Sequence, residues 1–377
     1  MGNVQGGRID WTDLVYSDDK AECAKYALAS GDVLFNRTNT IDLVGKTSIY
    51  SGEREALFAG YLIRIRVNRS LLDARFLNYF MNTEAARRHS AKVLSVAVGQ
   101  ANINGQKLRT YPIPLPPALA EQRAIAEALS DADAFIGSLV QLLAKKRLIK
   151  HGVMQELLTG KTRLPGFDAE WESASIGALF EFSGGYTASR DQLSSQGHCY
   201  LHYGDIHSST QTYIDLETEH DAIPKLDVSL SKVSPSSLLQ DGDIVFVDAS
   251  DDDDGTSRHV VIVNPEQRPF IAGLHTIVAS GARGRLAHEF RRFCFQIEAV
   301  KHQFRFFAVG TKVSGISKSN IAKVVVRFPS LPEQIEIARV LADIDSELIA
   351  LESKLTKARQ INQGMMQELL TGRIRLI

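Results

Sequence analysis

The sequence has few cysteines, no long apolar run and no recognisable leader, and each absence excludes a class of protein. Its three cysteines (Cys23, Cys199 and Cys294) are odd in number and widely spaced. That pattern argues against a disulfide scaffold or a zinc site and is typical of a reducing compartment. No stretch reaches the roughly 18 apolar residues of a membrane span. The opening residues MGNVQGGRID lack the basic and apolar regions of a secretory signal, so we expect a cytoplasmic protein with no membrane partner.

The sequence also lacks the common catalytic signatures. Gly160-Lys161-Thr162 ends like a phosphate-binding loop, but Gln155 stands where that loop needs its first glycine. The acidic run Asp251–Asp254 leads into Gly255, yet Val261 occupies the position where a calcium loop requires glutamate. The ten histidines form no HExxH, and no GxSxG is present. We therefore expect a binding protein that is not an enzyme and holds neither a cofactor nor a metal.

A formal net charge of −1 conceals a strongly uneven distribution of charge along the chain. Residues 31–111 carry 12 Lys and Arg against 6 Asp and Glu, and residues 256–327 carry 12 against 3. Residues 168–255 carry 3 against 18. The two basic blocks are candidates for binding a polyanion, although folding could mix the charges again. The acidic block is poorly suited to face DNA, and we expect it to point toward solvent or a basic partner.

An internal repeat is the strongest signal in the sequence. Residues 119–164 and 331–376 align without a gap, and 23 of the 46 positions are identical, including all of MQELLTG. A weaker match extends upstream, where Gly31-Asp32-Val33-Leu34-Phe35 corresponds to Gly242-Asp243-Ile244-Val245-Phe246. The chain therefore consists of a module, a helical segment, a second module and a second helical segment.

Each repeated segment has the pattern of one long helix. Apolar residues recur at alternating spacings of four and three, which is typical of a coiled-coil seam. Prolines precede each segment, and Gly160 and Gly372 stand where a C-terminal cap belongs. About 39 residues would make a rod of about 58 Å. We expect the two helices to pair antiparallel within the chain; packing on the modules alone, or homodimerisation, is the alternative.

The modules combine short β-rich runs with helices. Residues 32–35, 61–67, 243–247 and 259–263 are predicted strands, and residues 71–88 and 288–307 are predicted helices. We expect an α+β protein with two α/β modules separated by two long helices in an antiparallel coiled coil. The expected boundaries are 1–114 for the first module, 115–164 for the first spacer helix, 165–327 for the second module and 328–377 for the second helix.

This doubled pattern resembles the specificity (S) subunit of type I restriction–modification systems. The residues that carry the resemblance are Pro114-Leu115-Pro116-Pro117, Glu121-Gln122 and Leu157-Leu158-Thr159-Gly160-Lys161, with Leu331-Pro332-Glu333-Gln334 and Leu369-Leu370-Thr371-Gly372-Arg373 in the second copy. Gly31 to Arg37 resembles a strand of the family's target recognition domain. The resemblance covers nearly the whole chain, and its double occurrence makes it specific.

The resemblance implies that each module is a target recognition domain that reads one half of a split, asymmetric sequence in double-stranded DNA. The two helices would fix the gap between the half-sites and dock two modification (methyltransferase) subunits, which use S-adenosylmethionine to methylate adenine. Restriction (motor and endonuclease) subunits that use ATP and magnesium would join for cleavage. The specificity subunit itself would bind no cofactor and catalyse no step.

Base reading needs Arg, Lys, Asn, Gln or small polar residues on loops, and the two basic blocks supply candidates. In the first module these are Arg37, Thr38, Asn39, Lys46, Gln100, Asn102, Asn104, Gln106 and Lys107. In the second they are Arg258, His259, Arg283, Arg285, Lys312, Ser317 and Lys318. Any one of them could instead be an ordinary solvated residue.

The first module departs from the second at its beginning. Gly204-Asp205-Ile206 corresponds to Gly2-Asn3-Val4, so the segment from Trp171 to Tyr203 has no counterpart and the first module is expected to be short. The alternatives are therefore a truncated specificity subunit that assembles but reads one half-site, and a coiled-coil assembly protein without a DNA role. A metal-dependent nuclease built on Asp251–Asp254 is a further alternative, but the sequence shows no paired Glu and Lys for it.

Overall fold

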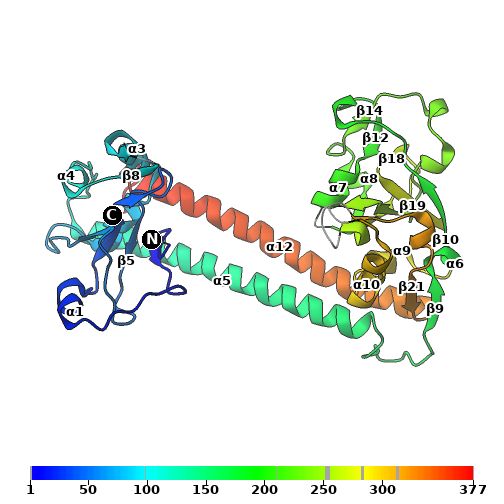
Figure 1. Ribbon diagram of the computed structural model, residues 1–377, viewed down its shortest axis with the longest axis horizontal. Helices are drawn as coiled ribbons and strands as arrows, with labels where there is room; N and C mark the ends of the chain where they lie inside the picture. Colours follow the sequence, from blue (N-terminus) through cyan, green and yellow to red (C-terminus); the bar gives the residue numbers. More distant parts are fainter. Residues whose placement is uncertain are drawn as a thin grey trace. The chain divides into compact units, whose positions relative to one another are not determined.

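The computed structural model describes residues 2–97, 99–209, 211–250, 255–281, 284–310 and 314–376, and the chain divides into two units. Unit 1 comprises Met1–Leu143 and Leu351–Ile377, and unit 2 comprises Ala144–Ala350. The division passes through both long helices, so each unit contains part of each helix. Both chain termini belong to unit 1 (Figure 1).

Unit 1 is built around a small antiparallel sheet whose central strand is buried. The elements ahead of the first long helix are β1 (Val4–Gln5), β2 (Arg8–Ile9), α1 (Lys20–Tyr26), β3 (Val33–Asn36), β4 (Thr38–Asn39), β5 (Thr47–Ile49), β6 (Leu62–Ile65), α2 (Ala74–Met81), α3 (Glu84–Val93), β7 (Ser95–Ala97), β8 (Gln100–Asn102) and α4 (Gly105–Leu108). The sheet order is β5-β3-β6, with Val33 opposite Ile49 and Ile65. Strand β3 is buried over its whole length, as its apolar sequence predicts.

Unit 2 repeats this plan with additional strands. Its elements are β9 (Glu172–Ser175), α6 (Ile176–Leu179), β10 (Phe180–Gly184), η1 (Arg190–Gln192), β11 (Leu193–Ser194), β12 (His198–Leu201), α7 (Tyr203–Ser208), β13 (Tyr213–Asp215), α8 (Leu216–Glu219), β14 (Lys225–Leu226), η2 (Leu230–Lys232), η3 (Pro235–Ser237), β15 (Ile244–Val247), β16 (Ala249–Ser250), η4 (Gly255–Ser257), β17 (His259–Val263), β18 (Phe270–Ala272), β19 (Thr276–Gly281), α9 (His288–Cys294), α10 (Glu298–Phe307), β20 (Ser314–Gly315), α11 (Lys318–Ile321) and β21 (Val325–Phe328). Its central sheet has the order β10-β19-β15-β17-β13, in which β17, β15 and β19 correspond to β5, β3 and β6.

Both faces of the central sheet in unit 2 are covered. On one face Ile244 and Phe246 join a core with Phe290 and Phe293 of α9. On the other face Val245 and its neighbours join a core with residues of β12 and β18, which belong to a second sheet of order β11-β14-β12-β18. Burial on both faces explains why β15 is apolar at every position.

The predicted pair of long helices is confirmed. Helices α5 (Leu119–Leu157) and α12 (Leu331–Leu369) are each 39 residues long (Figure 1). In unit 1 the beginning of α5 and the end of α12 share one core, which contains Ile125, Leu129 and Leu369. In unit 2 the end of α5 and the beginning of α12 share another, which contains Leu157 and Leu341. The helices are therefore antiparallel.

Polar pairs occupy the positions where the apolar seam softens. In unit 2 the Lys150 ammonium lies 2.5 Å from an Asp345 carboxylate oxygen. At the corresponding place in unit 1, the Asn362 side chain donates a hydrogen bond of 2.9 Å to Asp133. Both carboxylates are about a quarter exposed or less, and such groups need polar partners. Asp133 has two further partners in unit 1, the Tyr79 hydroxyl at 3.0 Å and the Arg8 guanidinium at 3.6 Å. A polar pair at such a position favours one register of the two helices.

A buried glutamine fastens the start of each long helix to the module that precedes it. Gln122 accepts a hydrogen bond from the Asp73 backbone N–H (2.9 Å) and donates two, to the carbonyls of Leu71 (3.1 Å) and Pro116 (3.0 Å). Its side chain reaches the residue that begins α2, because Asp73 is the N-cap of that helix. Only 1% of Gln122 is exposed.

Gln334 makes the same three bonds in unit 2. It accepts from the Ala287 N–H (2.8 Å), the N-cap of α9, and donates to the carbonyls of Arg285 (2.9 Å) and Pro329 (2.8 Å). We call this arrangement the glutamine fastening. Buried backbone groups must find hydrogen-bond partners, and here one side chain supplies three of them.

The glutamate beside each glutamine binds the tail that follows the other long helix. Glu121 forms a bidentate pair with Arg375 (2.6 and 2.7 Å), and Glu333 forms one with Arg163 (2.7 and 2.6 Å). The hydrogen bonds from Arg375 hold the pKa of Glu121 below its usual value. The adjacent Glu and Gln thus tie one module to both helices, and we call the two carboxylate–guanidinium pairs the clasp. Bidentate pairs of this kind are geometrically specific as well as strong.

Replacing the fastening glutamine should destabilise its unit. Gln334→Ala removes all three partners from buried backbone groups and should lower the free energy of unfolding by roughly 2–4 kcal/mol. Chemical denaturation of the purified protein measures this effect. The matched control is Gln363→Ala, at an exposed position of the same helix, which should change stability by no more than about 0.5 kcal/mol. Equal effects of the two substitutions would contradict the fastening.

The two capping glycines give a second, internally controlled prediction. Gly160 and Gly372 follow the helices with φ of +71° and +72°, so alanine at either position should cost about 1–2 kcal/mol. A Cβ at Gly160 would lie 3.1–3.3 Å from the Trp171 ring, whereas one at Gly372 would meet nothing within 4 Å. Gly160→Ala should therefore lower the denaturation midpoint more than Gly372→Ala does. A larger decrease in the midpoint for Gly372→Ala would show that the contact with Trp171 does not determine the effect of the substitution at Gly160.

Candidate nucleic-acid interface

A small polar sheet lies beside the central sheet of unit 1 and contains four of the predicted site residues, Thr38, Asn39, Gln100 and Asn102. Strands β4, β8 and β7 form it, with Thr38 opposite Asn102 and Asn39 opposite Ala101. The Asn102 amide donates to the Thr38 hydroxyl at 2.7 Å. We call β4, β8 and β7 the first polar sheet. Residues that are some 60 positions apart in the sequence are thereby held side by side.

The short helix α4 extends this surface. The side chain of Asn104 caps it by accepting a hydrogen bond from the Lys107 N–H at 3.0 Å. The Lys107 ammonium in turn donates to the Ser95 hydroxyl of β7. Gln100 is exposed, and so is Gln106 on α4. Seven predicted residues of the first module thus share one surface, namely Thr38, Asn39, Gln100, Asn102, Asn104, Gln106 and Lys107.

Arg37 joins the central strand to the first polar sheet. Its backbone is fixed on both sides, since its N–H donates to the Tyr61 carbonyl (3.2 Å) and its carbonyl accepts from the Ile103 N–H (2.9 Å). The side chain is half-buried, and its Nε is buried with no hydrogen-bond partner among the described residues. Lys46 lies close by, because its carbonyl accepts from the Asn36 N–H at 2.9 Å.

Unit 2 has a counterpart, which we call the second polar sheet. It consists of β16 and β20, with Ala249 opposite Gly315 and Ser250 opposite Ser314. Asp248 stands where Arg37 stands in unit 1: its N–H donates to the His275 carbonyl (3.2 Å), and its carbonyl accepts from the Ile316 N–H (2.7 Å). The same frame therefore presents different side chains in the two units.

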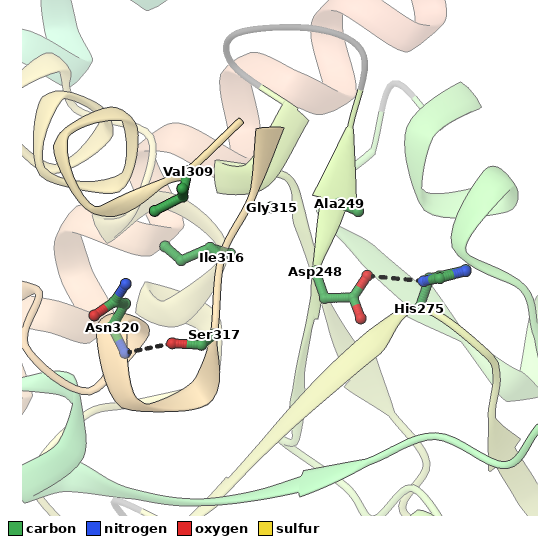
Figure 2. Close-up of a pocket in the computed structure, with 8 residues that line it drawn as sticks. All are labelled: Asp248, Ala249, His275, Val309, Gly315, Ile316, Ser317 and Asn320. Atoms are coloured by element: carbon green, nitrogen blue, oxygen red, sulfur yellow. Dashed lines mark hydrogen bonds and ion pairs between the residues drawn. The ribbon is translucent and has the colours of Figure 1, made fainter. Parts of the chain in front are cut away.

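A cavity of about 510 Å³ adjoins the second polar sheet (Figure 2). Its polar lining includes Asp248, His275, Ser317 and Asn320. The Nδ1 atom of His275 lies 3.2 Å from an Asp248 carboxylate oxygen, and both side chains are partly exposed. His275 has a φ of +58°, a conformation that costs free energy in a residue other than glycine and is often found at functional sites. Its ring also packs edge-on against Tyr203, with centroids 5.4 Å apart.

The predicted residues of the second module are less concentrated. Ser317 lies at the cavity and caps α11 by accepting from the Asn320 N–H at 3.3 Å, while Lys318 is exposed in α11 beside it. The Arg258 guanidinium donates to the His207 carbonyl at 2.7 Å. Arg285 instead contacts Glu172 and the Phe328 ring near the start of α12. Arg283 and Lys312 lie outside the described residues, as does the Asp251–Asp254 run.

The structure corrects the expectation for His259. This residue begins the buried strand β17, and only 5% of it is exposed. Its ring packs between Phe246 and Phe295, at centroid distances of 5.6 and 5.2 Å. Burial lowers its pKa to about 4, so the ring is neutral at physiological pH. Histidine followed by an apolar run is a strand beginning in the core, and this side chain cannot reach DNA in the structure.

Two residues of the candidate interface are not among those predicted from the sequence. Asp248 and His275 were overlooked because the first lies in the acidic block, which we expected to avoid DNA. The structure brings Asp248–Ser250 of that block against residues 314–316 of the basic block, so residues of the two blocks lie side by side in the fold. The sequence does contain a signal for Asp248. When the alignment of Gly31–Phe35 with Gly242–Phe246 is extended by two residues, Arg37 corresponds to Asp248.

The described residues offer little that points to other chemistry. They contain no group of three or more His, Cys, Asp and Glu placed to hold a metal ion. Within the same described parts, no helix is both long enough and apolar enough to cross a bilayer. Cys199 and Cys294 are buried free thiols, and burial raises the pKa of both, which makes them inert.

Comparison with known proteins agrees with this picture. A family model described as the type I restriction modification DNA specificity domain matches residues 5–145 and 168–362. A Methanocaldococcus jannaschii protein assigned as the MjaX type I restriction enzyme specificity subunit is 25% identical, over 99% of this chain and 86% of its own. The EcoKI specificity subunit of Escherichia coli is 23% identical, over 99% of this chain and 80% of its own.

A solved structure shares the fold. The type I restriction–modification S subunit from M. genitalium matches with a TM-score of 0.58 at 14% identity, over 92% of this chain and 84% of that one. The family model alone spans well over half of the sequence, in two segments that correspond to the two copies of the repeat. The chain therefore belongs to the family of type I restriction–modification specificity subunits.

Proposed function

We propose that this chain is the DNA-recognition subunit of a type I restriction–modification complex and that each unit reads one half of a split, asymmetric target. The observation that carries the proposal is the repetition of one surface, the polar sheet beside the end of the central strand, in both units. The backbone frame is the same and the side chains differ. Two readers of unequal half-sites need this combination, because base edges are distinguished by the donors and acceptors opposite them.

The chemistry of these surfaces supports base and phosphate contact. The first polar sheet offers hydroxyl and amide groups with Arg37 and Lys107 beside them. Amides and guanidinium groups match the major-groove edges of adenine and guanine, and the charged groups attract phosphates. In unit 2 Ser317 and Lys318 come from the second basic block. Ser317 lines the cavity, and Lys318 is the first residue of α11, which follows it.

The paired helices would serve as the spacer and the docking site. A rigid connection between two readers makes the separation of half-sites a geometric property of the protein. Helix α5 carries an exposed apolar stripe at seven-residue intervals, formed by Phe135, Leu142 and Ile149 at 45%, 40% and 42% exposure. Neighbouring exposed apolar side chains favour contact with a protein partner. We propose that two modification subunits bind the helices there.

Catalysis would belong to the partners. The modification subunits would bind S-adenosylmethionine and methylate adenine, and restriction subunits would use ATP and magnesium. This chain would contribute binding, orientation and spacing in the cytoplasm, with no catalytic group or cofactor of its own. Double-stranded DNA and these two kinds of subunit are its proposed partners.

The proposal predicts a specific methylation pattern in a living cell. The chain is co-expressed with its cognate modification subunit in a host that lacks adenine methylation, and N6-methyladenine is mapped by single-molecule sequencing. We expect the two proteins to co-purify and a split motif with two specified half-sites to be methylated. The matched control is the modification subunit expressed alone, which should give no motif.

Other outcomes identify the alternatives. A motif with a single specified half would indicate a subunit that reads with one unit only. A stable complex without methylation or salt-dependent DNA binding would indicate an assembly protein. DNA cleavage by the purified chain with a divalent metal would indicate a nuclease that uses the Asp251–Asp254 run.

A further inference from the structure

Residues 37 and 248 occupy the same position in the two units. Each follows the central strand directly, and each is held by two backbone hydrogen bonds of matching pattern. Residue 37 bonds to Tyr61 and Ile103, and residue 248 bonds to His275 and Ile316, the corresponding residues of the second unit. Because the frame is the same, the two side chains leave the backbone at equivalent places beside the two polar sheets.

The side chains at this position have opposite chemistry. Arg37 has only hydrogen-bond donors, and the ionised Asp248 has only acceptors. The Arg37 guanidinium has no hydrogen bond or ion pair with the described residues, although its Nε is buried. A half-buried guanidinium that the described residues leave without a partner is costly, so a ligand that accepts its hydrogen bonds would be strongly favoured.

The surroundings of Asp248 are those of a binding site. The carboxylate lines the cavity next to the second polar sheet, with 34% of its side chain exposed. One oxygen faces His275 Nδ1 at 3.2 Å, and Figure 2 draws no interaction between the other oxygen and the labelled residues. His275 is itself held in a left-handed backbone conformation that costs free energy, and its carbonyl accepts from the Asp248 N–H at 3.2 Å.

We infer that residues 37 and 248 are the equivalent specificity-determining positions of the two units. Arg37 donates to the O6 and N7 acceptors of a guanine, and Asp248 accepts from the N4 amino group of a cytosine, each in its own half-site. This inference rests on the proposed function, which it makes specific to one position in each unit. It also gives a physical reason why the two half-sites differ although the modules share one plan.

Two substitutions test the inference separately. Arg37→Gln and Asp248→Asn are co-expressed with the modification subunit, and methylation is mapped as for the unmodified chain. Arg37→Gln should relax a G·C requirement at one position of one half-site, with discrimination reduced on the order of 10- to 100-fold. Asp248→Asn should do the same at one position of the other half-site. Each variant should keep the unaffected half-site, which shows that the complex has assembled.

Two control variants make the same substitutions, Arg to Gln and Asp to Asn, at residues outside the polar sheets. Arg88→Gln removes an exposed arginine of α3. Asp241→Asn alters a second partly exposed Asp–His pair of unit 2, in which the carboxylate lies 3.5 Å from His288. Both controls should leave every base requirement unchanged. A control that relaxes the motif as strongly as Arg37→Gln or Asp248→Asn would overturn the assignment.

The remaining outcomes separate the inference from the proposed function. If the unmodified chain directs no split motif, the proposed function fails. If it does, and both variants keep the full motif, only the inference fails. Relaxation at an A·T pair by Asp248→Asn would mean that the carboxylate reads adenine N6, and relaxation at an A·T pair by Arg37→Gln would overturn the guanine assignment. If a variant stops methylation, Arg37→Ala or Asp248→Ala must give the relaxed motif, and renewed loss contradicts the inference.

Discussion

The buried glutamine at the start of each long helix is the interaction on which the rest of the structure depends. A single side chain satisfies a helix N-terminus and two carbonyls, and it does so in both units with matching partners. The glutamate that precedes it binds the arginine beyond the end of the other helix. Two adjacent residues therefore fix how a module, the helix that follows it and the end of the other helix meet within one unit.

The residues that hold the fold together are distinct from the residues of the candidate interface. The fastening, the clasp and the apolar seam recur at corresponding positions, so duplication preserved the parts that set geometry. The backbone of the polar sheets is the same in both units, but the side chains differ. Arg37 corresponds to Asp248, Thr38 to Ala249 and Asn102 to Gly315. A scaffold that does not depend on these side chains leaves them free to differ between the two units. Proteins commonly place variable functional residues at the edges of a rigid frame in this way.

The sequence predicted the helical elements well because their signals are local. The heptad spacing, the preceding prolines and the capping glycines located both 39-residue helices. Predicted strands 32–35, 61–67, 243–247 and 259–263 correspond to β3, β6, β15 and β17 with small shifts at their ends. The predicted helices 71–88 and 288–307 are each two helices, divided at Asn82-Thr83 and at residues 295–297. The apolar pattern continues across these breaks, so periodicity alone did not reveal them.

The candidate interface was harder to predict because it depends on the pairing of strands that are distant in the sequence. The sequence named Thr38 and Asn102 as candidates, but only the register of β4 and β8 shows that they touch. It proposed His259 from its polar side chain, whereas the pairing of β17 places that ring in the core. Asp248 was not proposed because the acidic block was treated as a single surface. In the structure, residues of that block lie in several different environments.

The most direct test of the account is where DNA contacts the assembled complex. Hydrogen–deuterium exchange of the chain with its modification subunits would be measured with and without DNA carrying the methylated motif. The account predicts DNA-dependent protection at residues 37–40 and 100–107 in unit 1 and at residues 248–250 and 314–320 in unit 2. Protection confined to other segments, such as residues 19–26 or 216–232, with both polar sheets unchanged, would contradict it.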